Sequence, residues 1–213
     1  MTATISPTLK GVSAGPPPVE WSDEQLLVRY RQTRDEQLFA ALVKRYEREL
    51  FEYLRSYLRD SQLAEDTFQT TFLHVHMKCH QFDKNRRVRP WLYKIATNLA
   101  IDNQRSRRRR AAMSLNAPCD PCDPESSTWI DYLVGSTQSP PVQVMKRESR
   151  SKSLAAMYEL PEHLRQVVLL IFFQGLKYRE AAEVLSIPLG TVKSRMHAAL
   201  RKLQDDLQPA TFS

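Results

Sequence analysis

Apolar side chains recur along most of this chain at intervals of three and four residues, which is the spacing of one face of an α-helix. The clearest such stripe consists of Phe39, Leu42, Val43, Tyr46 and Leu50. No stretch alternates between apolar and polar residues for long enough to indicate a β-strand. The pattern therefore predicts an all-α protein.

The first lobe, residues 23–110, contains four predicted helices, each with a recognisable start. Ser, Thr and Asp at an N-cap accept hydrogen bonds from free backbone N–H groups, and proline suits the first turn because it has no N–H to satisfy. The predicted starts are Ser22 with Gln25 in a capping box, Thr33 with Glu36, Asp60 or Ser61, and Pro90. These signals predict a small helical bundle.

The second lobe, residues 146–213, contains the pattern of a helix-turn-helix. A short helix over 178–185 is followed by a tight turn over 186–190 and a second helix over 191–203, for which Thr191 is the expected N-cap. Earlier helices are expected to open at Pro140 and Pro161, and one to end at Gly175.

The second helix of this motif has two different faces. Its inner face is predicted to consist of Val192, Met196, Ala199, Leu200 and Leu203, and its outer row of Lys193, Ser194, His197 and Arg201. A helix that reads the major groove needs such an outer row, because its side chains must reach base edges and phosphates. The alternative interpretation is an amphipathic helical hairpin whose polar face is merely solvated.

The 213 residues carry a net charge of +7, and this charge is unevenly distributed. Residues 23–110 carry +7 and residues 146–213 carry +4, whereas residues 111–145 carry −4 and contain no Lys or Arg. We therefore expect two small helical domains joined by a flexible acidic linker, preceded by a disordered tail over 1–22. So few acidic charges could also collect in the linker by chance. A basic protein favours a polyanionic partner such as nucleic acid.

Composition excludes several other classes of protein. The longest apolar run, residues 167–173, is far shorter than the roughly 20 residues that cross a bilayer. The first 20 residues lack the basic and apolar regions of a secretory signal, and three cysteines are too few for a disulfide scaffold. Membrane, secreted and collagen-like classes are excluded, and the sequence predicts a cytoplasmic protein.

Aromatic and cationic side chains are mixed where the fourth helix begins, and a run of arginines follows near its end. Such a mixture can hold unpaired bases, because rings stack on bases while cations hold the backbone. The first group comprises Lys84, Arg86, Arg87, Arg89, Trp91, Tyr93 and Lys94, and the second Arg105 and Arg107–Arg110. The second group suits duplex phosphates, although a solvated basic helix end would have the same composition.

Five segments together resemble extracytoplasmic-function sigma factors of the sigma-70 family. They are AEDTFQTTF at 64–72, WLYKIATNLAID at 91–102, LPEHLR at 160–165, GLKYREAAEVL at 175–185 and IPLGTVKSRM at 187–196. The resemblance covers about residues 23–110 and 150–207 in the family's order. It implies sigma region 2 over 23–110 and sigma region 4, a helix-turn-helix domain, over 146–213.

The resemblance also implies a function and partners. The chain would bind core RNA polymerase through the clamp of the largest subunit and the flap of the second, direct promoter recognition and DNA melting, and be restrained by an anti-sigma factor. It would be no enzyme and would need no cofactor. The linker would pass through the channel that nascent RNA later occupies.

Site residues follow from the same resemblance. Binding of the minus-ten element is assigned to Lys84, Arg86, Arg87, Arg89, Trp91, Tyr93, Lys94, Asn98, Arg105, Arg107 and Arg108. Binding of the minus-thirty-five element is assigned to Thr191, Lys193, Ser194, Arg195, His197 and Arg201. Docking on the polymerase clamp is assigned to Glu65, Asp66, Gln69 and Phe72.

The sequence departs from the family pattern at three positions. Thr70 stands where an acidic residue usually follows the glutamine of the docking motif. Lys177 stands where a Ser or Thr usually caps the first helix of the helix-turn-helix. Ser186 stands where the turn usually has glycine, so a positive φ with mild strain is expected there.

Other chemistry has weaker support. His76 and His80 share a helix face that Cys79 does not join, and Cys119 with Cys122 has CxxC spacing without a second pair. A redox or metal role for this linker pair is an open alternative. The rival functions are a stand-alone helix-turn-helix repressor and a zinc-dependent enzyme or sensor. The repressor interpretation leaves the basic and aromatic side chains of the first lobe unexplained.

Overall fold

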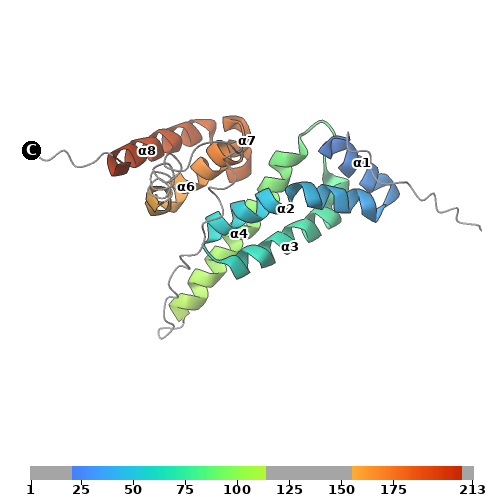
Figure 1. Ribbon diagram of the computed structural model, residues 1–213, viewed down its shortest axis with the longest axis horizontal. Coiled ribbons are helices and arrows are strands. Elements are labelled where there is room, and N and C mark those ends of the chain that lie inside the picture. Colours follow the sequence, from blue (N-terminus) through green and yellow to red (C-terminus); the bar gives the residue numbers. More distant parts are fainter. Residues whose placement is uncertain (1–20, 114–154, 208–213) are drawn as a thin grey trace, which may run out of the picture.

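The computed structural model describes residues 21–113 and 155–207, which form two helical lobes (Figure 1). The first lobe contains α1 (Asp23–Thr33), α2 (Glu36–Leu58), α3 (Ser61–Lys78), the short 3-10 helix η1 (Cys79–Gln81) and α4 (Val88–Met113). The second contains a helical segment over 155–159, α6 (Glu162–Val168), the π-helical turn η3 (Leu169–Phe173), α7 (Tyr178–Leu185) and α8 (Leu189–Leu207). These ranges contain no strand, and the all-α prediction is confirmed.

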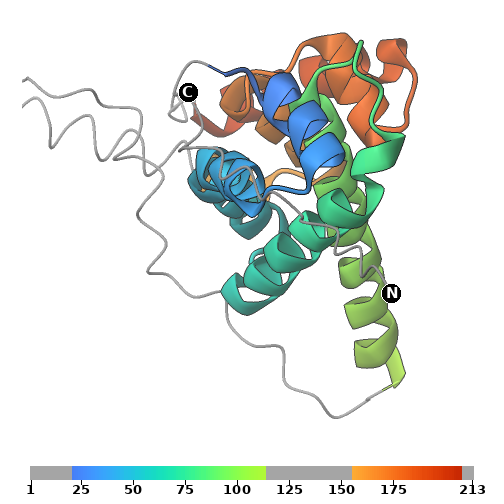
Figure 2. The same cartoon turned by 90° about the vertical axis from the view of Figure 1, so that its right-hand side faces the viewer.

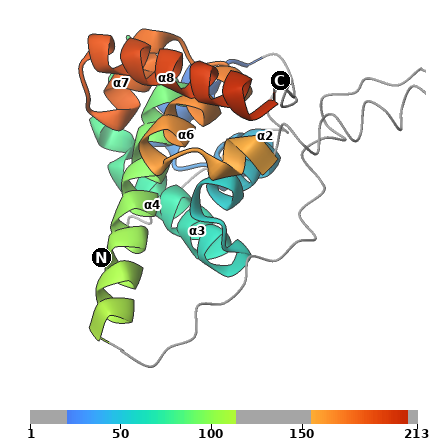
Figure 3. The ribbon, with the colours of Figure 1, turned by 90° about the vertical axis from the view of Figure 1, so that its left-hand side faces the viewer.

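Helix α4 is the long central element of the first lobe. It packs against α2 and α3 along its inner side, and the second lobe lies across its first half through α7 (Figures 2 and 3). The last turns of α4 extend beyond the other helices. The predicted tail over 1–22 and linker over 111–145 lie mostly outside the described ranges, but Ser22 caps α1 and residues 111–113 belong to the end of α4.

Two of the predicted caps in the first lobe are confirmed. Ser22 and Gln25 form a reciprocal capping box, with N–H to side-chain oxygen distances of 2.8 and 3.2 Å. Asp60, rather than Ser61, caps α3 through a 2.9 Å bond from the Leu63 N–H. Pro90 lies in the first turn of α4, as expected.

The predicted start of α2 at Thr33 is wrong. Thr33 is the last residue of α1, and its hydroxyl donates to the Arg29 carbonyl. Asp35 is the N-cap instead and accepts a 2.9 Å bond from the Gln37 N–H. The negative charge of a carboxylate at this position also interacts favourably with the positive end of the helix dipole, whereas a hydroxyl carries no charge.

Buried tyrosines fill the space between α2 and α4. Tyr53 is fully buried and shares a 2.8 Å hydrogen bond with the hydroxyl of Thr97, which is also buried. The ring of Tyr93 packs edge to face against the ring of Tyr53, at a centroid distance of 5.1 Å. Tyr46 donates to Asp23 at 2.5 Å and so ties α2 to α1. Each hydroxyl thus has a partner, as burial requires.

The second lobe is assembled from short helices around a small apolar centre. Its buried residues include Leu164, Val167, Leu169, Ala181, Val184, Val192, Met196 and Ala199. Pro161 is the N-cap of α6, and Gly175 has a φ of +64°, as predicted for a residue that ends a helix. The expected opening at Pro140 lies outside the described residues.

Buried Arg165 joins the segment 155–159 to α6. Its guanidinium donates to the carbonyls of Tyr158 and Leu160 at 3.3 and 3.2 Å. Burial lowers the pKa of Arg165, and the nearby charge of Arg59 lowers it further. The carbonyl acceptors offset part of this cost, so the residue has a structural role.

Alkaline pH is expected to destabilise the protein through the buried tyrosines. Burial raises the pKa of Tyr46, Tyr53, Tyr57 and Tyr93 above the usual value near 10. Their contribution to stability is therefore present below about pH 10 and is lost above it, by about 1.4 kcal/mol per pH unit for each tyrosine. Urea unfolding followed by circular dichroism between pH 9 and 11 measures this slope.

Tyr53→Phe is the control for this prediction. It removes one titrating group, so the slope of unfolding free energy against pH should become shallower by about 1.4 kcal/mol per unit. An unchanged slope would contradict the assignment of the alkaline instability to these side chains.

Candidate nucleic-acid interface

One face of α4 carries a stripe of exposed polar and cationic residues. Helical spacing of three, four and seven positions brings Trp91, Lys94, Asn98 and Arg105 onto one face, and Arg87 directly precedes the helix at the end of this row. The stripe consists of Arg87, Trp91, Lys94, Asn98 and Arg105, all exposed except Trp91, which is half-buried. The opposite side of the helix is buried by Ala96, Thr97 and Ala100. The packing of the small residues thus directs the stripe towards solvent.

Trp91 is held in place by a second aromatic ring. Its indole packs on the buried ring of Phe82 at a centroid distance of 5.2 Å and an interplanar angle of 58°. Phe82 is fixed in turn by the bond from Arg31 to its carbonyl. A supported, half-buried indole between cations is suited to stacking on an unpaired base.

Two predicted minus-ten residues point to the opposite side of α4. Tyr93 is fully buried, and its hydroxyl donates to Gln174 Oε1 at 2.5 Å. Arg89 donates to Glu49 Oε1 at 2.6 Å and lies over the rings of Tyr46 and Tyr93. Burial lowers the pKa of Arg89, but Tyr93 and Glu49 raise it by more, so the guanidinium remains charged.

The remaining predicted cations of this lobe are partly paired. Arg107 binds the N-cap carboxylate of α3, Asp60, at 2.6 Å, and Arg108 binds Glu162 at 2.6 Å. On the loop before α4, Arg86 lies 3.8 Å from Glu183, and Lys84 is exposed. The structure therefore brings only part of the predicted set together on one open face.

The helix-turn-helix is confirmed, with its second helix beginning earlier than expected. Helix α8 starts at Leu189, so Thr191 lies in the first turn and the prediction that it is the N-cap is wrong. The Pro188 carbonyl accepts the Val192 N–H at 3.1 Å, which shows that the helix has already begun there. Proline before the first helical residue fixes the backbone φ at a value that suits the start of a helix.

Both departures from the family pattern at the ends of α7 are visible. Lys177 occupies the N-cap without a side-chain cap bond, and the Glu180 carboxylate accepts its N–H at 2.8 Å. Ser186 has a φ of +53°, the left-handed conformation expected there. The Ile187 N–H bonds the Ala182 carbonyl at 3.1 Å and completes the tight turn.

The outer row of α8 is exposed as predicted, whereas the inner face is narrower than predicted. Lys193, Ser194, His197 and Arg201 are exposed, while Thr191 and Arg195 are half-buried. Leu200 is 53% exposed, and the prediction that it belongs to the inner face is wrong. It lies at the edge of the apolar stripe, between buried Met196 and half-buried Leu203 on one side and the exposed outer row on the other.

An open hollow of about 320 Å³ lies beside this outer row. It is lined by Tyr178, Lys193, Met196, His197 and Leu200. Tyr178 and Leu200 are the residues that sequence reasoning missed. The i, i+4, i+7 spacing of Lys193, His197 and Leu200 was the available signal.

The exposed face of α3 combines polar and apolar side chains. Glu65, Asp66 and Gln69 are exposed, as expected for a docking surface. Phe72 is only 6% exposed and packs against Phe39 and Phe68, so it supports the helix from within the core. The exposed apolar contacts on this face are instead Leu73 and Met77, at 56% and 48%.

Leu73 and Met77 could have been found in the sequence. They are separated by four residues and fall off the apolar stripe formed by Phe68, Phe72 and Val75. Apolar residues that repeat at helical spacing outside the core stripe indicate a second contact face.

Metal-binding and membrane-spanning features are not found within the described ranges. His76 bonds the Tyr30 hydroxyl through Nδ1, and no three His, Cys, Asp or Glu side chains lie together there as a metal site would require. Cys79 is buried, and Cys119 and Cys122 lie outside the description. Over 21–113 and 155–207, no helix has the length and apolar character to span a membrane.

The fold and surfaces together define a two-lobed helical DNA-binding protein, and comparison with known proteins identifies its family. Residues 42–110 match sigma-70 region 2, and residues 154–203 match sigma-70 region 4. The ECF RNA polymerase sigma factor SigW of Bacillus subtilis is 33% identical over 81% of this chain and 92% of its own length. The chain belongs to the extracytoplasmic-function sigma factors of the sigma-70 family.

Further matches agree with this assignment. RNA polymerase sigma-H factor of Pseudomonas aeruginosa is 29% identical over 88% of this chain and 94% of its own length. The solved sigma factor RpoE of Bartonella quintana, crystallised with the anti-sigma factor NepR, has the same fold with a TM-score of 0.63 at 22% identity. That match covers 79% of this chain and 96% of the solved one. The protein is therefore a sigma factor for promoter-specific transcription initiation and not an enzyme.

The strained turn of the helix-turn-helix generates a prediction about stability. Ser186→Gly should stabilise the protein by roughly 0.5–1 kcal/mol, because glycine adopts a positive φ without steric cost. Thermal unfolding by calorimetry measures the effect. Ala198→Gly, at an exposed position within α8, is the control and should lower stability by about 1 kcal/mol. A loss of stability in both variants would show that Ser186 is not strained.

Proposed function

We propose that each of the three surfaces described above has a separate role in transcription initiation. The stripe of α4 holds the melted strand of the minus-ten element, the outer row of α8 reads the minus-thirty-five element, and the exposed face of α3 docks on core polymerase. The single observation that carries this proposal is Trp91, which is supported by Phe82 and flanked on the same face by Arg87 and Lys94.

The minus-ten surface would act by trapping bases after they leave the duplex. A flipped base would stack on Trp91, while Lys94 and Arg105 hold the phosphates of the same strand. Asn98 lies between these cations and can hydrogen-bond a base edge or a sugar. Lys84 and Arg86 would extend the contact from the preceding loop.

The minus-thirty-five surface would act by direct readout in the major groove. Lys193 and His197 lie beside the hollow at the start of α8, which is the end of a recognition helix that contacts base edges. Ser194 and Arg201 lie next to them and would contact phosphates. Tyr178 would close the hollow from the first helix of the motif.

Docking on polymerase would combine charge and apolar contact. Glu65, Asp66 and Gln69 offer acceptors to a basic partner surface, and Leu73 with Met77 offer apolar area on the same side of α3. Thr70, in place of an acid, donates its hydroxyl to the Asp66 carbonyl at 2.7 Å and adds no charge. We expect Leu73 and Met77 to supply the contact that the missing acid does not.

Control of the protein by an anti-sigma factor also belongs to this proposal. The solved RpoE of Bartonella quintana was crystallised with such a partner, and its fold is that of this chain. A cytoplasmic location follows from the need to meet polymerase and DNA, and region 4 would also meet the polymerase flap.

Run-off transcription tests the function as a whole. Purified core polymerase with the full chain should yield new transcripts from genomic DNA, and core polymerase alone should not. Tight binding of a palindromic duplex by the chain as a dimer, without core polymerase, would instead favour a repressor.

Trp91→Ala should slow strand opening while leaving the closed complex largely intact, because the stacking platform is used only after bases unpair. Permanganate footprinting of unpaired thymines measures opening, and gel shift measures closed-complex binding. Trp91→Phe retains a ring and should recover much of the rate. Equal footprints for wild type and Trp91→Ala would remove this residue from the melting step.

Lys193→Ala should weaken promoter binding of the holoenzyme by about 1–3 kcal/mol and relax the upstream preference if Lys193 reads a base. Lys202→Ala is the matched control, since Lys202 is exposed on the opposite side of α8. Competition binding with promoter fragments measures both variants. Equal losses would mean that α8 contributes only general positive charge.

A further inference from the structure

Helix α1 contacts both ends of the loop that precedes α4. It packs against η1 on one side of this loop and against α4 on the other (Figures 1 and 2). The loop over 83–87 is exposed at every position, whereas the residues that flank it, Phe82 and Val88, are buried. The loop therefore leaves the core at Phe82 and returns to it at Val88.

Two charged side chains of α1 hydrogen-bond the backbone of these flanking residues. The Glu24 carboxylate accepts the Val88 N–H at 3.0 Å, and Arg31 donates from Nη1 to the Phe82 carbonyl at 3.3 Å. Val88 is the first residue of α4 and Phe82 ends η1, so both groups lie where a helix leaves its N–H or C=O groups without an internal partner. Each side chain has the polarity that its partner needs, since a carboxylate accepts and a guanidinium only donates.

The spacing of Glu24 and Arg31 allows them to act as a pair. They are seven residues apart, so they lie on one face of α1 and about 10 Å apart along its axis. Leu27 and Tyr30 are buried on the same helix and fix it against the core. Helix α1 thus sets the distance between the two ends of the loop.

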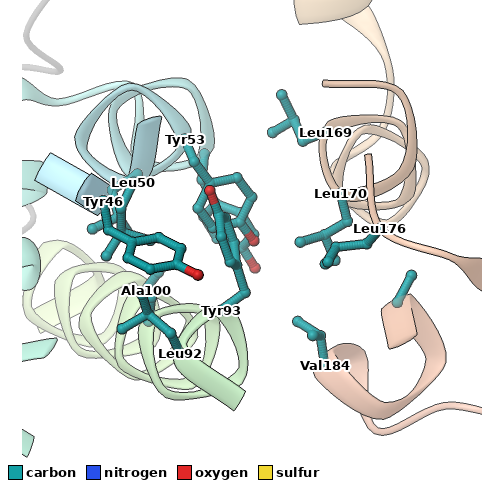
Figure 4. Packing of buried hydrophobic residues seen from close by; sticks show 14 of the residues in the cluster. Tyr46, Leu50, Tyr53, Leu92, Tyr93, Ala100, Leu169, Leu170, Leu176 and Val184 are labelled. Carbon is teal, nitrogen blue, oxygen red and sulfur yellow. The ribbon is translucent and has the colours of Figure 1, made fainter. Parts of the chain in front are cut away.

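The body of α4 is held by other contacts. Leu92 and Ala100 bury its inner side against Tyr46 and Leu50 of α2 (Figure 4). The two hydrogen bonds from α1 act only on the first residue of α4 and on the segment before it.

The loop carries cations that would spread it over several conformations if its ends were free. Lys84, Arg86 and Arg87 lie within four positions and repel one another. Asp83 orders the middle of the loop, since its carboxylate accepts the Asn85 N–H and its carbonyl accepts the Arg86 N–H, both at 2.9 Å. The bonds from α1 extend this order to both ends.

Trp91 depends on the same two anchor points. It follows Val88 by about one turn of α4 and packs on the ring of Phe82 at a centroid distance of 5.2 Å. A shift at either end of the loop would therefore move the indole relative to the cations of the loop.

We propose that Glu24 and Arg31 are positioning residues for the minus-ten surface. They hold the loop and Trp91 in one arrangement before the melted strand arrives, which reduces the conformational entropy that is lost when the strand binds. Neither side chain contacts DNA in this role. The role rests on the proposed function of the α4 stripe.

Permanganate footprinting of the holoenzyme tests this role on a promoter fragment identified by run-off transcription. Glu24→Ala and Arg31→Ala should each slow strand opening by about fivefold, the effect of losing one ordinary hydrogen bond. Closed-complex binding in a gel shift should stay unchanged, because α8 is untouched. Glu24→Gln keeps an oxygen acceptor and should recover most of the opening rate.

Ser22→Ala is the matched control for a general weakening of α1. It removes the N-cap bond of the same helix and destabilises it, but leaves both contacts to the loop in place. It should open the promoter at the wild-type rate. Glu47→Ala, at an exposed position of α2, controls for the loss of one acidic charge.

Circular dichroism checks that each variant is folded, and urea unfolding measures its stability. If Glu24→Ala does not fold, Glu24→Asp replaces it, because the shorter side chain keeps the charge but no longer reaches the Val88 N–H. It should show the same opening defect.

Wild-type opening rates in the Glu24 and Arg31 variants would overturn this inference. An equal defect in Ser22→Ala would do the same, since any weakening of α1 would then slow opening. Trp91→Ala distinguishes the two levels of failure. If Trp91→Ala slows opening and the α1 variants do not, only the positioning role fails, whereas wild-type opening in all of them defeats the proposed function of the stripe.

Discussion

The close packing of α4 on α2 and α3 is the constraint on which the rest of the structure depends. Small buried residues, Ala96, Thr97 and Ala100, let the helices approach, and the Tyr53 hydroxyl fixes their register through Thr97. Because α4 cannot rotate about its axis, each of its outer residues has a defined direction. The stripe that includes Trp91 faces solvent, and Tyr93 faces the second lobe.

The helices and their starts were largely predictable, because capping and apolar periodicity are local signals. Ser22, Asp60 and Gly175 act as expected. The predictions that Thr33 and Thr191 are N-caps were wrong for a shared reason. In each case a neighbouring residue starts the helix better than the threonine hydroxyl would. Asp35 supplies a charged cap, and Pro188 fixes the backbone three residues before Thr191, so that α8 has already begun when the chain reaches Thr191.

The composition of the site was also predictable, whereas the division of its residues between faces was not. A list of cations near Trp91 does not say which of them are already paired. Arg107 and Arg108 find carboxylates more than forty residues away in sequence, and Tyr93 finds Gln174 in the other lobe. Such partners depend on tertiary packing, for which the sequence carries no local pattern. The buried position of Phe72 likewise reflects which helix covers it.

The π-helical turn η3 has a consequence for how this family member can diverge. The Gln174 N–H bonds the Leu169 carbonyl five residues back, so the turn contains one residue more than an α-helix would use. The wider turn absorbs this extra residue, so the loss of one codon within 169–173 would leave a regular α-helix there without turning the following helices by a full residue step. The segment before the helix-turn-helix can therefore gain or lose one residue in evolution while α7 and α8 keep their orientation.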